Sequence, residues 1–165
     1  MTIRLARPDE LETLQDIEDD AGLRFEAAGM PGDLEGLGLD VLAAGVRDGL
    51  LFVLDLDGPQ GFALCQAFDD TLHLRELDVV RALQGRGHGR ALLDHVRSVA
   101  RDRGLAGVSL TTFRDVPFNA PFYARYGFRE VLPADQPVWL AEIRRHEREA
   151  GLDRWPRLAM RIPAS

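Results

Sequence analysis

The chain has 165 residues, of which 45% are hydrophobic and 28% charged, and this length suits one domain with a full core over residues 1–165. Its formal net charge of -7 excludes non-specific binding to nucleic acid or acidic membranes, which requires an excess of Lys and Arg. No apolar run approaches the ~18 residues of a membrane helix, the N-terminus lacks a signal-peptide pattern, and the single Cys65 fits a reducing compartment, so we expect a cytoplasmic protein.

The N-terminal part predicts one strand and two helices. Apolar and polar residues alternate over Thr2–Arg7, as in a short strand. Pro8 opens a helix whose apolar residues recur at helical spacing as far as Ala28. A glycine-rich stretch over 29–38 predicts a mobile loop, and Leu39–Asp48 predicts a second helix that ends at a glycine.

Three strand-like runs follow. Leu50–Asp55 and Gln60–Phe68 are separated by Asp57-Gly58-Pro59, a turn signal that predicts an antiparallel hairpin. Thr71–Val80 extends the sheet as a third strand.

The third of these runs changes the parity of its apolar positions. Leu72 and Leu74 share one parity, whereas Leu77 and Val79 share the other. A strand with one buried face needs an inserted residue to do this, which predicts a β-bulge near residues 75 and 76. A strand buried on both faces is the alternative.

A glycine-rich turn, Gln84–Arg90, lies between that strand and the next helix. Its glycines allow close backbone approach, and the start of a helix offers N–H groups without intrahelical partners, so the turn predicts a phosphate or pyrophosphate site. The spacing fits neither a P-loop nor a dinucleotide fingerprint, and a plain glycine turn is the simpler alternative.

The C-terminal half alternates helices and strands. Gly87–Arg103 reads as an amphipathic helix and Val108–Thr112 as a strand, and the strand–helix–strand order predicts a parallel pair in a mixed sheet. The remaining predicted elements are a short helix over Ala120–Tyr126, a strand over Phe128–Leu132, a helix over Pro137–Ala150 and a strand over Arg157–Ile162.

Two motifs resemble one known family. The pattern Gln-x-x-Gly-x-Gly from Gln84 resembles the acyl-CoA pyrophosphate loop of the GNAT superfamily of N-acetyltransferases, and Phe122–Phe128 resembles its closing Phe/Leu-Tyr-x-x-x-Gly-Phe motif. One helix and one strand separate them, as in that family, and the string Thr111–Tyr123 is similar to a bacterial subgroup. The resemblance implies an α/β (α+β) fold with a mixed, mostly antiparallel sheet of about six to seven strands flanked by helices. It also implies a β-bulge and strands splayed at an acyl-CoA cleft.

The resemblance implies acetyl-CoA as co-substrate. Its pyrophosphate would lie on the N–H groups of the glycine turn, and its pantetheine arm on the backbone of the third strand, much like an added strand. The implied cofactor-binding residues are Leu77, Asp78, Val79, Gln84, Gly85, Arg86, Gly87, His88, Gly89, Arg90, Asn119, Phe122 and Tyr123.

Asn119 marks a departure from the family pattern. Many members carry Asn-x-x-Ala before the tyrosine, but here Val116 occupies the place of the asparagine and Asn119 that of the alanine. We expect Asn119 to cap the following helix, with a CoA contact as the alternative.

Transfer requires a neutral amine, which an alkylamine supplies rarely at pH 7, so a general base is valuable. We expect Glu76 in this role, directly or through water, with Asp78 as its rival and His73 as a weaker candidate. By the resemblance Tyr123 is the general acid for the departing thiolate, and an aromatic packing role is its alternative.

The acceptor is predicted only as a class, a primary amine of a small molecule, amino acid or peptide. By analogy the wall of its site comes from Arg24, Phe25, Glu26, Met30 and Trp139. Arg24 could hold a carboxylate, which favours an amino acid or a peptide terminus.

Two other functions stay open, a domain that senses CoA or acyl-CoA without turnover and an enzyme that uses a longer acyl donor.

The four histidines have no metal-ligand spacing, so no metal is predicted, and Cys65 is predicted to be a small buried hydrophobic residue. The charged run Arg144–Glu149 reads as a solvated helix face and not as a nucleic-acid site. The oligomeric state is open, a homodimer included.

Overall fold

The computed structural model describes residues 1–30, 34 and 36–165. Part of the predicted loop over 29–38 therefore lies outside the described residues. The helices and strands are β1 (Thr2–Leu5), α1 (Leu11–Ala27), α2 (Leu39–Asp48), β2 (Leu51–Asp55), β3 (Pro59–Phe68), β4 (Thr71–Val79), α3 (His88–Asp102), β5 (Gly107–Phe113), α4 (Ala120–Tyr126), β6 (Arg129–Val131), α5 (Val138–Glu149) and β7 (Arg157–Pro163). Short 3-10 helices cover Pro8–Glu10, Arg81–Leu83, Pro133–Asp135 and Leu152–Arg154.

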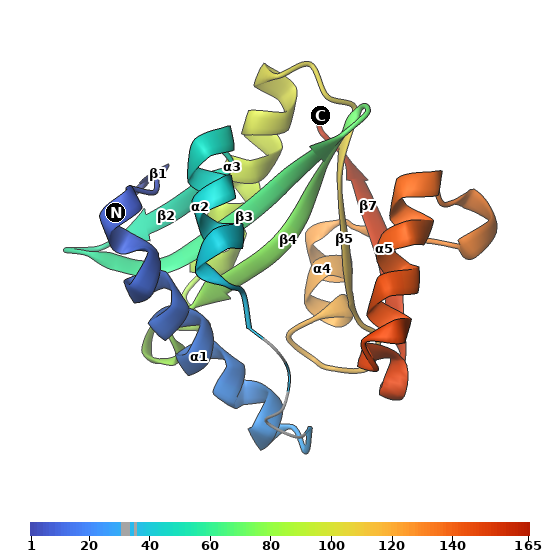
Figure 1. Ribbon diagram of the computed structural model, residues 1–165, viewed down its shortest axis with the longest axis horizontal. Coiled ribbons are helices and arrows are strands. Elements are labelled where there is room, and N and C mark those ends of the chain that lie inside the picture. The colour runs from blue at the N-terminus through green and yellow to red at the C-terminus, as the bar shows by residue number, and fades with distance from the viewer. Residues whose placement is uncertain (31–33, 35) are drawn as a thin grey trace. The chain divides into compact units, whose positions relative to one another are not determined.

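The strands form a seven-stranded sheet in the order β1-β2-β3-β4-β5-β7-β6 (Figure 1). β4 and β5 are parallel, while the pairs β1–β2, β2–β3, β5–β7 and β6–β7 are antiparallel. The predicted mixed, mostly antiparallel sheet of six to seven strands with flanking helices is confirmed, as are the β2–β3 hairpin and the parallel pair around α3.

The chain divides into two compact units. Unit 1 comprises Met1–Gln66 and Leu74–Val99, and unit 2 comprises Ala67–His73 and Ala100–Ser165. The expectation of a single domain stays a prediction.

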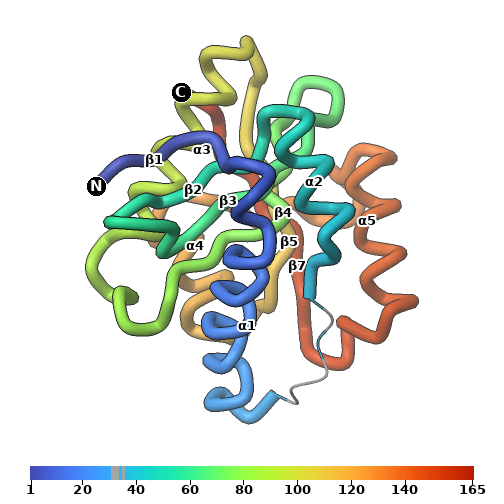
Figure 2. The backbone as a smooth tube through the Cα atoms, turned by 60° about the vertical axis from the view of Figure 1, so that its left-hand side comes forward, coloured from blue at the N-terminus to red at the C-terminus, as the bar shows by residue number. Residues whose placement is uncertain are grey.

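Unit 1 has helices on both faces of its strands. Leu51 and Val53 of β2 belong to the same core cluster as Leu14 of α1 and Leu42 of α2, and these two helices contact each other (Figures 1 and 2). The intervening Phe52 points to the opposite face, where its ring meets that of His95 on α3 at 4.8 Å. Coverage of both faces explains why β2 is a continuous apolar run.

In unit 2 β5 is the central strand and pairs with β7 along its whole length, from Gly107 opposite Pro163 to Phe113 opposite Arg157. Thr111 on β5 donates a hydrogen bond to Glu147 of α5 (2.6 Å). Helix α5 therefore lies on the face of the sheet to which Thr111 points. Strand β5 also pairs with β4, where Thr71–His73 lie opposite Gly107–Ser109.

The first predicted helix begins differently from expectation. Pro8–Glu10 form a 3-10 turn, and the α-helix starts at Leu11. Glu10 explains the turn, because its buried carboxylate accepts hydrogen bonds from the Arg7 backbone N–H (2.9 Å) and the Arg4 guanidinium (2.6 Å). These contacts tie the start of the helix to β1.

Candidate active site

The glycine turn that follows β4 has the backbone geometry of an anion-binding loop. Gly85 and Gly87 have φ values of +77° and +87°, which side chains other than glycine rarely adopt. Both are exposed, and α3 begins at His88 directly after them. The Ala91 N–H donates to the Gly87 carbonyl (3.0 Å), and the N–H groups before it have no intrahelical acceptor by helix geometry.

Two contacts fix this turn against the rest of unit 1. The Gln84 side-chain amide donates to the Val79 carbonyl (2.8 Å), which links the turn to the end of β4. The Arg81 backbone N–H and guanidinium both bind Asp20 of α1 (2.7 and 3.2 Å). Asp20, although distant in sequence, is thus adjacent to the turn and neutralises the charge of Arg81.

The second half of β4 carries both candidate bases. Thr71–Leu74 are all buried, Arg75 is exposed, and Glu76 to Asp78 are half-buried. The continuous burial of Thr71–Leu74 agrees with the alternative prediction for this strand, in which both of its faces are buried. The bulge near residues 75 and 76 stays a prediction, as do the splayed strands.

Asp78 lies in an unusual electrostatic environment. Its Oδ2 atom is closed off from solvent and has no hydrogen-bond partner. Burial raises the pKa of Asp78 well above its usual range, and the neighbouring Glu76 and Glu18 raise it further. Asp78 therefore keeps its proton to a higher pH than an ordinary aspartate.

Glu18 of α1 is a functional candidate that sequence reasoning missed. One carboxylate oxygen each from Glu18, Glu76 and Asp78 lie within 4.8 Å of one another, and this group is named the carboxyl triad below. The Leu37 backbone N–H donates to Glu18 Oε1 (2.8 Å), and burial raises the pKa of Glu18. Charge at Glu18 was visible in the sequence, but no local pattern connects it to a strand about sixty residues later.

Tyr123 lies in an aromatic cluster of unit 2. Its ring is buried and meets those of Phe122 at 5.2 Å and Phe128 at 5.6 Å. Asn119 occupies the N-cap position of α4, but its side chain makes no capping hydrogen bond, so the expected capping bond is wrong. Its φ and ψ of -112° and -115° lie outside the conformation usual for a cap, which explains the loss.

The family assignment follows from comparison with known proteins. The profile of the acetyltransferase (GNAT) domain matches residues 47–130, just over half of the chain, including β4, the glycine turn and α4. The chain belongs to the GNAT acetyltransferase family. The predicted family is confirmed, and the membership supports acyltransferase activity.

Solved structures of GNAT proteins share the fold. N-acetylglutamate synthase from Neisseria gonorrhoeae, complexed with coenzyme A and N-acetyl-glutamate, is 18% identical with a TM-score of 0.76, and the match covers 99% of this chain but 35% of that one. The ribosomal-protein-S18-alanine N-acetyltransferase from Escherichia coli is 21% identical (TM-score 0.69; 99% and 94% covered). PaiA N-acetyltransferase from Thermoplasma acidophilum, complexed with coenzyme A, is 15% identical (TM-score 0.68; 98% and 98%).

The predicted acceptor wall is divided between the two units. Arg24, Phe25, Glu26 and Met30 lie at the end of α1 and just after it in unit 1, where Met30 is buried and burial lowers the pKa of Arg24. Trp139 belongs to unit 2.

Trp139 has a clear packing role. Its ring stacks on that of Phe68 at 4.6 Å and meets the edge of His73 at 5.7 Å. His73 is itself buried, with Nδ1 2.9 Å from the Ser109 hydroxyl. The ring of His73 therefore packs against Trp139 within unit 2, and Cys65 is buried, as expected.

The charged run of α5 is not uniformly solvated. Arg144 is buried and binds Glu147 (2.7 Å) and Asp153 (2.8 Å), so the predicted solvated face is wrong at this residue. Arg145 remains exposed. The long-range partner Asp153, outside the helix, compensates the buried charge.

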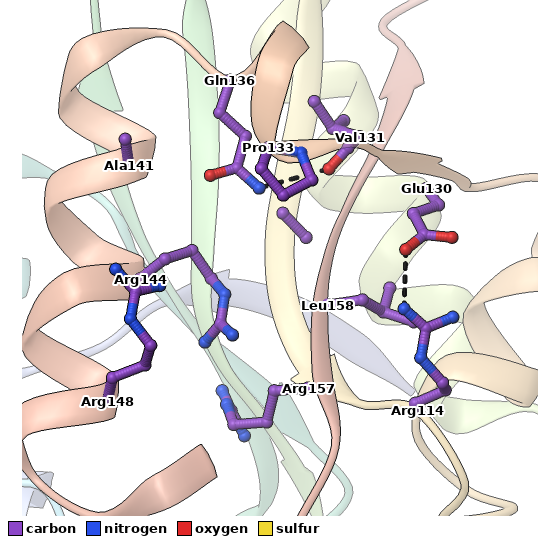
Figure 3. A pocket seen from close by; sticks show the side chains of 11 residues that line it. Arg114, Glu130, Val131, Pro133, Gln136, Ala141, Arg144, Arg148, Arg157 and Leu158 are labelled. Carbon is purple, nitrogen blue, oxygen red and sulfur yellow. Dashed lines mark hydrogen bonds and ion pairs between the residues drawn. The ribbon is translucent and has the colours of Figure 1, made fainter.

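A pocket of about 230 Å³ in unit 2 is lined by four arginines, as Figure 3 shows: Arg114, Arg144, Arg148 and Arg157. Arg114 is paired with Glu130 (2.7 Å), while Arg144 and Arg157 share Glu147. Three carboxylates, those of Glu130, Glu147 and Asp153, thus offset three of the guanidinium groups, so this pocket is not a strong anion site.

In the part of the chain that the structure describes, no helix is long and apolar enough to cross a membrane.

Proposed function

We propose that this GNAT protein transfers an acetyl group from acetyl-CoA to a primary amine by direct attack in a ternary complex. The observation that carries the proposal is the exposed turn at the end of β4, where Gly85 and Gly87 have positive φ and lead into α3. Such a turn presents backbone N–H groups to a pyrophosphate. Acetyl-CoA is the acyl donor that fits the family, and the solved relatives with bound coenzyme A support the choice.

The residues of the turn, Gln84–Arg90, hold the pyrophosphate in this proposal, with Arg86 and Arg90 as exposed cations. The pantetheine amides pair with the backbone of Leu77–Val79. The ladder to β5 involves Thr71–His73, at the opposite end of β4, which supports the availability of this part of the strand. The Val79 carbonyl accepts from Gln84, and in this proposal the Val79 N–H polarises the thioester carbonyl. Asn119 and Phe122 complete the proposed CoA contacts.

Glu76 accepts the proton of the amine, directly or through water. Asp78 is the weaker candidate because its enclosed carboxyl group favours the protonated form. The neutral amine then forms the C–N bond and the C–S bond breaks. Tyr123 donates a proton to the thiolate of CoA, and the proton released from the new amide nitrogen restores the phenol. General acid or base catalysis of this kind contributes roughly 10²- to 10⁴-fold.

Thiol release from acetyl-CoA across a panel of amines tests the proposal, together with binding of CoA by calorimetry. We expect Tyr123→Phe and Glu76→Gln to lower kcat by about 10²-fold or more while CoA binding is retained. Phe128→Leu is a matched control for loss of aromatic packing beside Tyr123, because Phe128 is not among the proposed CoA contacts. Failure to bind CoA would refute the proposal, and tight binding without turnover on any amine would favour the CoA-sensing alternative. Turnover only with longer acyl-CoA donors would favour the alternative of an enzyme that uses a longer acyl donor.

A further inference from the structure

Asp20 connects helix α1 to the segment that leads into the glycine turn. Its Oδ2 atom accepts a hydrogen bond from the Arg81 backbone N–H (2.7 Å), and its Oδ1 atom lies 3.2 Å from the Arg81 guanidinium. Arg81 begins the short 3-10 helix Arg81–Leu83, which ends at Gln84. Each oxygen of Asp20 thus has a donor, unlike the carboxyl triad, in which Asp78 Oδ2 has none.

The contact caps a short helix that has no cap of its own. The first N–H groups of a helix lack an intrahelical acceptor, and aspartate is among the residues best suited to satisfy them. The N-cap residue here is Val80, whose side chain makes no capping hydrogen bond. Asp20 supplies the acceptor from 61 residues earlier in the chain. The conformation at the start of this segment therefore depends on α1.

Apolar packing holds α1 against the same point. Val80 packs against the core cluster that contains Ile17 of α1. Ile17 precedes Asp20 by three residues, so the two side chains lie on the same face of the helix. The Val80 N–H donates to the Gln60 carbonyl of β3 (3.0 Å). The residue before Arg81 is therefore fixed on two sides, and the Arg81 N–H is directed to Asp20.

The 3-10 helix in turn fixes the residue that begins the glycine turn. The Gln84 N–H donates to the Arg81 carbonyl (3.3 Å), and the Gln84 side-chain amide donates to the Val79 carbonyl (2.8 Å). Gly85 follows at once with its φ of +77°. A change in the position of Arg81 therefore moves Gly85 and the N–H groups that come after it.

We propose that Asp20 is a positioning residue for the cofactor, which holds the glycine turn in the conformation that binds the pyrophosphate of acetyl-CoA. The inference rests on the proposed function, in which this turn is the pyrophosphate site. Asp20 acts through the Arg81 backbone N–H and not by contact with the cofactor. It therefore affects the affinity for acetyl-CoA and not the transfer step.

The charge of Asp20 and its role as a cap have opposite effects on an anionic cofactor. A carboxylate beside the turn repels a pyrophosphate and neutralises Arg81, so removal of the charge alone should strengthen binding. Loss of the acceptor leaves the N–H uncapped and lowers the fraction of protein whose turn is ready to bind, which weakens binding. Asparagine separates the two effects, because it caps as well as aspartate and carries no charge.

Calorimetric titration of CoA into the wild type, Asp20→Ala and Asp20→Asn tests the inference without requiring turnover. We expect Asp20→Ala to raise the Kd for CoA by about 3- to 10-fold, as the loss of a cap lowers the competent fraction. Asp20→Asn should bind CoA at least as tightly as the wild type. Asp19→Ala removes the same charge from the exposed neighbouring position of α1 and should leave the Kd unchanged.

Kinetics and hydrogen exchange separate positioning from a general loss of structure. With any amine that is turned over, Asp20→Ala should raise the KM for acetyl-CoA and leave kcat unchanged. Exchange of the Arg81 amide in the cofactor-free protein should be faster in Asp20→Ala than in Asp20→Asn. Thermal unfolding of each variant confirms folding. Asp20→Ser, whose side chain is shorter than that of aspartate, replaces Asp20→Ala if the latter is unstable.

Several results would overturn the inference. They are an unchanged Kd in Asp20→Ala, equal weakening by Asp20→Ala and Asp20→Asn, or equal weakening by Asp19→Ala. Tighter binding by both Asp20→Ala and Asp20→Asn would show that only the charge of Asp20 matters, and a lower kcat at unchanged KM would place its effect on the transfer step. Failure of the wild type to bind CoA is a separate result that refutes the proposed function itself.

Discussion

Replacement of Asp78 by asparagine should stabilise the protein at neutral pH and above. The Oδ2 atom is enclosed without a donor, and Glu76 and Glu18 lie beside it. An amide of the same shape removes one of three acidic groups and provides an N–H donor to the other two. At low pH the protonated carboxyl can donate to Glu76 as the amide would, so the gain develops only as the pH rises. An unsatisfied buried polar group costs about 1–3 kcal/mol, so we expect a gain of that size at pH 8. For a chain of this size each kcal/mol corresponds to about 2–4 °C in Tm.

The protonation of Asp78 determines the pH range in which Asp78→Asn is more stable than the wild type. The pKa of Asp78 is raised in the folded state above the unfolded value of about 3.9, so the folded protein binds the proton more tightly. Wild-type stability is therefore complete below about pH 4 with respect to this group and falls as the pH rises through the folded pKa. Asp78→Asn has no such loss. The two proteins should be equally stable near pH 4 and diverge above it.

Urea unfolding between pH 4 and pH 8, followed by circular dichroism, measures the divergence. Asp16→Asn, an exposed change on α1, is the matched control and should shift the free energy of unfolding by no more than about 0.5 kcal/mol at any pH. A difference between wild type and Asp78→Asn that is constant with pH, or a less stable variant at pH 8, would refute the assignment of an enclosed, protonated Asp78.

Two further substitutions test other parts of the structure. Gly87→Ala places a side chain at a φ of +87° and should cost about 1–2 kcal/mol and weaken CoA binding measured by calorimetry, whereas Gly22→Ala inside α1 should stabilise by up to about 1 kcal/mol. An unchanged Gly87→Ala protein would contradict the loop geometry. Arg144→Ala removes a buried guanidinium that binds Glu147 and Asp153 and should cost about 3 kcal/mol in urea unfolding, while Arg145→Ala at the exposed neighbouring position should cost much less. Equal effects of the two would contradict the burial of Arg144.

Local patterns predicted most of the secondary structure. The helix over Leu39–Asp48 was predicted at its observed bounds, because Gly49 in the left-handed conformation ends it as a glycine there should. The hairpin and the α3 crossover were predicted for the same reason, since turn residues and apolar periodicity are properties of a few consecutive residues. The 3-10 start at Pro8 was not, because it depends on contacts of Glu10 with β1.

Contacts between distant segments account for what could not be predicted. Glu18 and Arg144 both look like ordinary surface charges within their helices. Glu18 lies close to Glu76 and Asp78 of β4, and Arg144 binds Asp153 beyond the end of its helix, and neither relation falls within a helical repeat. The motif around Tyr123 identified the family, but Asn119 showed that a residue in a capping position need not form the capping bond.

The departures from local rules in unit 1 concentrate at the end of β4. Gly61 on β3 is one, since a Cβ atom there would come within 2.7 Å of the Asp78 carbonyl oxygen. The unsatisfied Oδ2 of Asp78 and the positive φ values of Gly85 and Gly87 are the others. Strained or unsatisfied groups cost stability and tend to cluster where binding requires them. Because a ligand that binds the folded protein raises its stability, coenzyme A should raise the Tm of this protein, and Gly87→Ala should reduce that rise if the glycine turn is where it binds.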